Sequence, residues 1–402
     1  MNEKDIQCRA TQFIPSDLRD EVNLHIDKVR SQMRNDGIEA CLIGANPNIC
    51  YLTLRFFRGY VWVPAQGNPV WFTICPEHLQ GDMVRVIRKV EQIPTMLAEL
   101  GEAVPAKLGI EHGELPYSEV ERIKKAFGGI ETVDCTLTMR HARMVKTEWE
   151  QKQMRVDGAL QASVYAKVPD LYREGMTDVE LQIAIEGELR KKGCLGYPRV
   201  SGRLMQINLG SVISGDNADC PSPYDFSMGG AGVDPTLPVG ADGKEIMVGT
   251  AVMVDMNGAF NAYQSDMTRT WRVGDLPQTA MLAHRCSCDI LRELEKCKPG
   301  TPIADMYRKA VEMARERGLE EYFMGHNRRV AFIGHGVGIE LNELPVVMGR
   351  SRDILQEGMT IALEPKFVIP HVGAVGVENT YIATPDGLES ITVGSEEIAN
   401  LI

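Results

Sequence analysis

The sequence lacks the features that indicate a membrane protein, a secreted protein or a nucleic-acid-binding protein. No run of 18 apolar residues occurs, and no basic, then apolar, then small-residue pattern opens the chain. The first feature would indicate a transmembrane helix and the second a signal peptide. Basic residues are outnumbered by acidic ones, with 43 Lys and Arg against 55 Asp and Glu, and the net charge is −12. A chain with this net charge is unsuited to binding nucleic acid or an anionic membrane. We therefore expect a cytoplasmic protein with no nucleic-acid or membrane partner.

Cysteine is present without a pattern. The ten cysteines are scattered and include no Cys-x-x-Cys pair, so reduced thiols are expected rather than a disulfide framework. Cys286 and Cys288 lie in a helical pattern, where residues two apart point in different directions, and we assign them a structural role. The remaining composition, 44% hydrophobic and 24% charged over 402 residues, is that of a globular protein, and the length predicts two domains.

Residues 1–145 alternate between strand and helix patterns, which is typical of an α/β domain. Helices are predicted over 15–35, with Ser16 as the candidate cap, and over 82–90 and 117–126. Strands are predicted over 39–45, 48–53, 61–63, 70–75, 107–110 and 132–135. No catalytic spacing occurs here, so we expect this domain to serve dimerisation and the shielding of a site elsewhere.

The second domain, residues 146–402, begins close to Arg143. Thr147 and Glu150 form a capping-box pattern, which predicts a helix extending towards residue 165. Two Gly-Thr-helix-Gly units follow, over residues 175–193 and 300–318. Each lies beside a strand pair that carries acidic residues, and we interpret the recurrence as an internal duplication.

Two aspartates lie on a predicted β-hairpin. The runs 252–256 and 265–270 are rich in strand-forming residues and flank a segment of small residues and Asn. A turn centred on Phe260 and Asn261 places Asp255 directly opposite Asp266, with Cβ atoms about 4.5–5.5 Å apart. A cation shared between the carboxylates would remove their repulsion. Alternatively, this is a solvated surface hairpin with two unrelated aspartates.

A second predicted hairpin carries two glutamates. Residues 360–364 and 375–380 flank a turn whose midpoint is His371, so a symmetric hairpin places Glu364 opposite Glu378. Between the two hairpins, His335 lies in Gly-His-Gly-Val-Gly, where glycines allow close backbone approach. Four carboxylates and an imidazole suit divalent manganese, cobalt, iron or zinc. Five ligands exceed what one ion takes from protein when water also binds, and they fit a pair of metals better.

These residues resemble the metal ligands of the pita-bread metallohydrolases, the group of methionine aminopeptidase, aminopeptidase P, prolidase and creatinase. Their order and spacing match, and the Asn-x-x-Tyr-Leu-Thr run at 48–53 resembles the amino-terminal domain of creatinase and prolidase. The resemblance implies an α+β fold class: a pita-bread catalytic domain with pseudo-twofold halves at 146–402, preceded by a smaller α/β creatinase-type domain at 1–145. It also implies a homodimer.

The same resemblance implies a metal-dependent hydrolase. Two divalent metals, manganese first and cobalt, iron or zinc as alternatives, would be held by Asp255, Asp266, His335, Glu364 and Glu378. They would activate a bridging water, with Glu364 as the general base. The implied substrates are small peptides, with Xaa-Pro peptides the first to test.

The pocket departs from the family at three positions. A histidine of the relatives is replaced by Ser222, a second by Asn342, and an arginine by Gly376. Asn can orient an oxyanion but cannot titrate near neutral pH, so we assign Asn342 a catalytic and substrate-binding role, with Ser222 and His371 as further substrate-binding candidates. The alternatives are a small-metabolite enzyme, either a creatinase-like C–N hydrolase or similar to dimethylsulfoniopropionate lyase, and a metal-binding pseudoenzyme.

Overall fold

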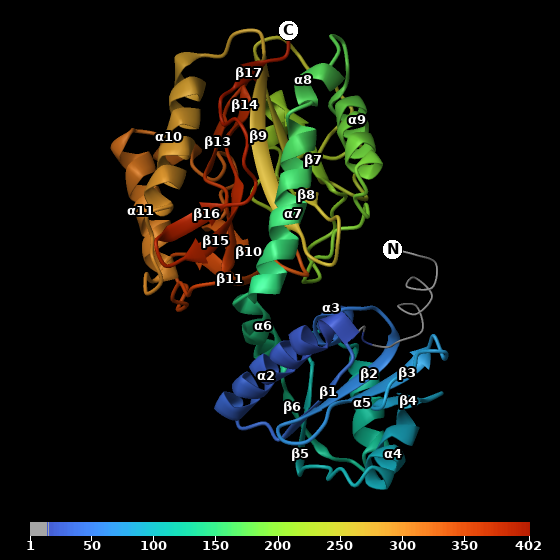
Figure 1. Cartoon of the computed structure of the whole chain (residues 1–402). Coiled ribbons are helices and arrows are strands. Elements are labelled where there is room, and N and C mark those ends of the chain that lie inside the picture. The colour runs from blue at the N-terminus through green and yellow to red at the C-terminus, as the bar shows by residue number, and fades with distance from the viewer. Residues whose placement is uncertain (1–13, 15) are drawn as a thin grey trace. The chain divides into compact units, whose positions relative to one another are not determined.

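The computed structural model describes residue 14 and residues 16–402. The chain divides into two compact units, Met1–Arg143 and Met144–Ile402 (Figure 1). In the described part of the chain, no helix has the length and apolar character needed to cross a lipid bilayer.

The first unit is built on a mixed six-stranded sheet with the order β4-β3-β2-β1-β5-β6. Its central strand β1 runs antiparallel to β2 and parallel to β5, and the alternation of strands and helices confirms the predicted α/β character. The strands are β1 (Ala40–Ile43), β2 (Arg58–Pro64), β3 (Val70–Cys75), β4 (Val84–Val86), β5 (Lys107–Ile110) and β6 (Glu131–Asp134). The helical segments are η1 (Ser16–Leu18), α2 (Arg19–Asp36), α3 (Asn46–Thr53), η2 (Val90–Gln92), α4 (Ile93–Glu99), α5 (Tyr117–Ala126) and α6 (Thr136–Met144).

Residues 48–53 form a helix, so the predicted strand is wrong. Helix α3 covers Asn46–Thr53, and the buried Glu111 carboxylate accepts N–H bonds from Gly44 and Ala45 just before it, at 2.8 and 2.9 Å. The Asn48 side chain donates to the same carboxylate and accepts from Arg143 at 2.7 Å. These partners are far away in the sequence, and they outweigh the strand preference of the apolar run.

The predicted helix over 82–90 is also wrong. Val84–Val86 form β4, which pairs in parallel with β3, so a free sheet edge decides the structure of this segment. In addition, Ser16 does not cap a helix: a 3₁₀ turn occupies Ser16–Leu18, and α2 begins at Arg19 without a side-chain cap bond.

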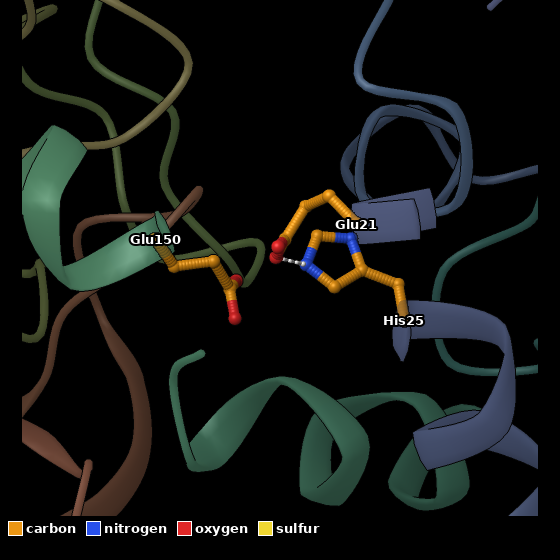
Figure 2. A group of neighbouring side chains, drawn as sticks. All are labelled: Glu21, His25 and Glu150. Carbon is orange, nitrogen blue, oxygen red and sulfur yellow. Dashed lines mark ion pairs between the residues drawn. The ribbon is translucent and has the colours of Figure 1, made fainter. Parts of the chain in front are cut away.

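Helix α2 packs on α3 through a buried histidine. The His25 ring stacks on Tyr51 with centroids 4.1 Å apart, and its Nδ1 donates to the Tyr51 carbonyl at 2.7 Å. Figure 2 shows the Glu21 carboxylate, one helical turn before His25, directed at the ring with its oxygen 2.9 Å from Nε2.

The second unit contains three sheets. Their orders are β11-β10-β12-β15-β16, β13-β14 and β17-β9-β8-β7. The strands are β7 (Gly210–Ser214), β8 (Thr250–Gly258), β9 (Ser265–Val273), β10 (Phe332–Gly336), β11 (Glu343–Met348), β12 (Thr360–Leu363), β13 (Lys366–Ile369), β14 (Gly373–Gly376), β15 (Asn379–Thr384), β16 (Gly387–Ser390) and β17 (Ala399–Asn400). The helical segments are α7 (Glu148–Tyr165), α8 (Val168–Leu171), α9 (Asp178–Lys191), η3 (Gly215–Asp219), α10 (Gln278–Leu294), α11 (Ile303–Glu316) and η4 (Glu320–Tyr322).

Two capping signals of the sequence locate the starts of α7 and α9. Thr147 and Glu150 form the predicted capping box at the start of α7. Thr177 forms a capping box with Glu180 at the start of α9. Such local hydrogen bonds involve neighbours in the chain, which is why the sequence predicts them without tertiary information.

Two main hydrophobic cores divide the second unit into halves. One core joins α7–α9 to β7–β9, and the other joins α10 and α11 to β10–β16. Each half therefore packs its own helices on its own strands, as Figure 1 shows by colour, green to yellow and then orange to red. The acidic hairpin β8–β9 comes from the first half, and β10, β12 and the β13–β14 hairpin come from the second.

Candidate metal centre

The first hairpin forms with a different register from the predicted one. Asp255 lies opposite Thr268, and Asp266 lies opposite Asn257, because the loop between β8 and β9 takes up residues 259–264. The two aspartates are therefore diagonal neighbours rather than a direct pair. The offset is two residues, so both side chains remain on the same face of the sheet, and cross-strand diagonals are still within reach of one another.

Buried side chains of α7 hold this hairpin. Tyr165 donates to the Met267 carbonyl at 2.6 Å, and the Ser265 hydroxyl donates to Gln161 at 2.7 Å. Asp157 accepts from the N–H of Phe260 at 2.8 Å. Burial raises the pKa of Asp157 to about 7, against the effect of its hydrogen bonds. These contacts shape the loop that sets the register.

The second hairpin has the predicted register. Leu363 pairs with Asn379 in one sheet, and Lys366 pairs with Gly376 in the next. Glu364 and Glu378 lie between these two stretches at the same register, and both are buried. His371 is at the turn, with a left-handed φ of 62°. The prediction that the glutamates face each other is confirmed.

His335 lies on β10 between two glycines that allow close strand contact. A Cβ on Gly334 would be 2.1 Å from the Ala362 carbonyl oxygen of β12, and a Cβ on Gly336 would be 2.0 Å from that of Leu344. The His335 Nδ1 donates to the Gly336 carbonyl at 3.1 Å, which leaves Nε2 as the free ligand atom. Nε2 is 3.7 Å from Asp266 and 3.9 Å from Glu364.

A lysine that the sequence analysis did not identify lies among the carboxylates. Lys366 Nζ is 2.8 Å from Asp255 Oδ2, 2.8 Å from Glu364 Oε2 and 3.0 Å from Glu378 Oε2, and its side chain has 0% exposure. Nζ also donates to the Ser227 hydroxyl at 3.3 Å. A signal was present in the sequence, because Glu364 and Lys366 are two residues apart in an extended segment and therefore share a face.

The electrostatics of this cluster favour cations. Burial raises the pKa of Asp266 well above its ordinary value, and the nearby Asp255 and Glu364 raise it further. Burial and the charge of Asp266 do the same for the pKa of Glu378. Burial alone would lower the pKa of Lys366, but its carboxylate partners outweigh that effect and hold the pKa well above the usual range. Carboxylates buried this closely require positive charge.

The donor set is suited to a divalent metal. Ligand atoms of Asp266, His335 and Glu378 lie within 4.8 Å of one another, as do those of Asp255, Glu364 and Glu378. Within the described part of the chain, the buried Glu378 Oε1 has no hydrogen-bond partner, while its Oε2 accepts from Thr268 Oγ1 at 2.7 Å. A buried oxygen without a partner is costly, and a metal ion would satisfy it.

Asn342 makes two hydrogen bonds to the backbone of one residue. Its Oδ1 accepts from the Ser201 N–H at 2.7 Å, and its Nδ2 donates to the Ser201 carbonyl at 2.7 Å. The preceding residue, Leu341, donates its N–H to the Arg199 carbonyl at 2.7 Å. Asn342 therefore ties segment 199–201 to the chain that follows β10.

Ser222 and His371, the other two predicted substrate-binding residues, do not join the carboxylate cluster. Ser222 is buried, accepts from the Tyr224 N–H at 3.3 Å and borders a cavity of about 20 Å³, room for about one water molecule. His371 is exposed at the hairpin tip, where its N–H donates to Asp216 at 2.8 Å. The loop that carries Ser222 reaches the cluster through Ser227.

Comparison with known proteins identifies the family. The model of metallopeptidase family M24 matches residues 152–385, and that of the creatinase/prolidase N-terminal domain matches residues 25–145. An Xaa-Pro dipeptidase of Pyrococcus furiosus is 29% identical over 383 residues, 93% of this chain and 99% of that protein. One of Pyrococcus horikoshii is 26% identical over 385 residues, 94% and 99% of the two chains.

Solved structures share the fold. The prolidase of Pyrococcus horikoshii superposes with a TM-score of 0.75 at 24% identity, covering 93% of this chain and 99% of that one. An Xaa-Pro dipeptidase of Bacillus anthracis superposes with a TM-score of 0.78 at 24% identity, covering 94% and 99%. The predicted α+β fold, with a pita-bread domain after a creatinase-type domain, is confirmed. Peptidases of the M24 family are dinuclear-metal enzymes, and the chain, a metal-dependent hydrolase, belongs to metallopeptidase family M24.

Proposed function

We propose that the protein is a metal-dependent dipeptidase that cleaves the peptide bond preceding proline. The observation that carries the proposal is the convergence of ligand atoms of Asp266, His335 and Glu378, a glutamate whose Oε1 has no hydrogen-bond partner, within one family M24 fold. The relatives named Xaa-Pro dipeptidase match almost the whole chain, which supports the substrate class. Manganese is the first metal to test, with cobalt, iron and zinc as alternatives.

Each residue of the centre has a separate task. A bound divalent metal supplies a Lewis acid and lowers the pKa of water. Asp266, His335 and Glu378 would hold the metal, with the His335 ring oriented by its bond to the Gly336 carbonyl. Glu364 Oε1, 3.9 Å from His335 Nε2, accepts the proton of the attacking water and returns it to the leaving nitrogen, while Lys366 holds Oε2.

One observation favours a second candidate. The amide of Asn342 bonds to the Ser201 backbone, and Ser222 lies outside the carboxylate cluster. Asn and Ser also do not titrate near neutral pH, so neither position supplies a proton-transfer group beside the proposed metal ligands. A small polar metabolite, cleaved at a carbon–nitrogen or carbon–sulfur bond, does not need the same proton transfers as a peptide. This remains the alternative.

The test is a substrate panel with metal control. Chelator-treated protein, reloaded with Mn²⁺, is assayed on Xaa-Pro dipeptides, on matched Xaa-Ala dipeptides, and on creatine-like and betaine-like compounds. We expect turnover of Xaa-Pro substrates that disappears with chelator and in His335→Ala. Metal-dependent turnover of the metabolites alone would replace the peptidase assignment, and no turnover with metal bound would indicate a pseudoenzyme. A cytoplasmic location stays a prediction.

A further inference from the structure

The side chain of Lys366 points to an unusual metal stoichiometry. Its ammonium group has three N–H donors, and three carboxylate oxygens accept them, from Asp255, Glu364 and Glu378 at 2.8, 2.8 and 3.0 Å. The same three residues form one of the two groups able to hold a metal in this centre. The lysine and a metal ion would therefore compete for one set of ligands.

The remaining ligand atoms form a second, complete set. Glu364 and Glu378 each bind Lys366 with Oε2, which leaves Oε1 of both. Glu364 Oε1 is 3.9 Å from His335 Nε2, and Asp266 Oδ2 is 3.7 Å from it. Ligand atoms of Asp266, His335 and Glu378 lie within 4.8 Å of one another, and the Glu378 Oε1 has no hydrogen-bond partner. Three such ligands suit a borderline divalent ion with an open position for water, and Glu364 Oε1 stays available beside it as the base.

The neighbouring strand makes room for the lysine. Gly376 pairs directly with Lys366 across the β13–β14 hairpin, and a Cβ at Gly376 would be 3.0 Å from Lys366 Cα and 3.3 Å from Cγ. Any larger side chain at 376 would meet the lysine stem. The stem is enclosed, because Lys366 has 0% exposure, so its ammonium is not a surface charge that reaches the cluster by chance.

We propose that the protein binds a single divalent metal per chain, through Asp266, His335 and Glu378, and that the Lys366 ammonium takes the place of the second metal. Four carboxylates with one ammonium and one divalent ion are close to charge balance. A second divalent ion would have to lie within a few ångströms of Nζ while sharing its oxygens, and like charges at that distance repel strongly. The inference rests on the metal dependence of the proposed function and not on its substrate.

Metal counting tests this directly. Full-length protein is stripped with chelator, dialysed against excess Mn²⁺ and analysed for bound manganese per chain. We expect about one ion in the wild type and about two in Lys366→Ala, because removal of the side chain frees Asp255 and two Oε2 atoms. The matched control is Lys146→Ala: Lys146 is also buried and ion-paired, 2.9 Å from Glu343, but lies outside the cluster, so its count stays at about one.

A second variant keeps the test valid if Lys366→Ala does not fold. In the proposal, Asp255 binds only the ammonium, so Asp255→Asn retains the wild-type count of about one. If Asp255 instead ligates a second metal, the wild type holds about two ions per chain and Asp255→Asn holds fewer. Electron paramagnetic resonance of the Mn²⁺ protein gives an independent readout, with the six-line signal of an isolated ion expected in the wild type and exchange coupling in Lys366→Ala.

The outcomes separate this inference from the proposed function. Two ions or an exchange-coupled spectrum in the wild type would overturn the single-metal proposal, whatever the enzyme cleaves. One ion in the wild type, together with no cleavage of any Xaa-Pro dipeptide, would support the metal count and remove the peptidase assignment. Unchanged counts of about one in Lys366→Ala would also overturn the role assigned to the lysine.

Discussion

At the scale of single residues, the candidate metal centre depends on side chains outside the proposed ligand set. Asp157 on α7 accepts the Phe260 N–H and lies 3.4 Å from the Ser265 hydroxyl. It thereby contacts the loop and the first residue of the strand that carries Asp266. Because the carboxyl group is buried, the fold favours its neutral form.

We expect Asp157→Asn to remove a pH dependence of stability. Burial raises the pKa of Asp157 from an ordinary 3.8 to about 7 in the folded protein. The stabilisation is therefore complete below about pH 4 and is lost as pH rises through about 7, by on the order of 4 kcal/mol at full ionisation. Urea unfolding from pH 5 to 8 should show the wild type weakening relative to Asp157→Asn. Parallel curves for the two proteins would contradict the assignment.

Asn342 offers a second test at this scale. We expect Asn342→Ala to lower the free energy of unfolding by about 1–2 kcal/mol, since two hydrogen bonds to the Ser201 backbone are lost. Hydrogen exchange should show the Ser201 amide losing protection. If stability and exchange stay unchanged while turnover falls, Asn342 acts on the substrate, as the sequence analysis predicted.

At the scale of elements, glycines decide how closely helices can pack. Gly158 lies in the middle of α7, and a Cβ there would be 2.4 Å from the Ile391 carbonyl oxygen. Gly187 lies in α9, and a Cβ there would meet nothing within 4 Å. The two positions have the same helical backbone and opposite surroundings.

We therefore expect opposite effects from the same substitution. Gly158→Ala should destabilise by about 1–3 kcal/mol, because α7 must move away from the chain at Ile391. Gly187→Ala should stabilise by about 0.5–1 kcal/mol through helix propensity alone. Chemical denaturation of both variants measures the difference. A stabilising Gly158→Ala would show that the α7 contact is not tight.

At the scale of the whole molecule, the homodimer stays a prediction. The creatinase-type unit carries no catalytic spacing in its sequence, and symmetric dimers are the commonest of soluble oligomers. We expect light scattering at micromolar concentration to give a mass near twice the chain mass of 44.6 kDa. A mass near 44.6 kDa would exclude the dimer.

Local sequence patterns were sufficient to predict the starts of α7 and α9 and the symmetric second hairpin. Thr147 and Thr177 bond to neighbours three residues away, and the turn at His371 is halfway between the two glutamates. The two carboxylate pairs that the sequence predicted follow from strand alternation and spacing, because residues that share a face of a hairpin are close whatever the rest of the chain does.

Only the tertiary structure decided the remainder. The 48–53 segment became a helix through contacts with Glu111, and the first hairpin shifted its register where α7 holds its loop. The role proposed for Lys366 could be inferred only from the folded chain, in which the two halves place Asp255 2.8 Å from its Nζ. The sequence determined which groups are available for chemistry. Which carboxylates face a metal and which face the Lys366 ammonium was decided by the folded chain, because the distances between these groups depend on strands more than 100 residues apart.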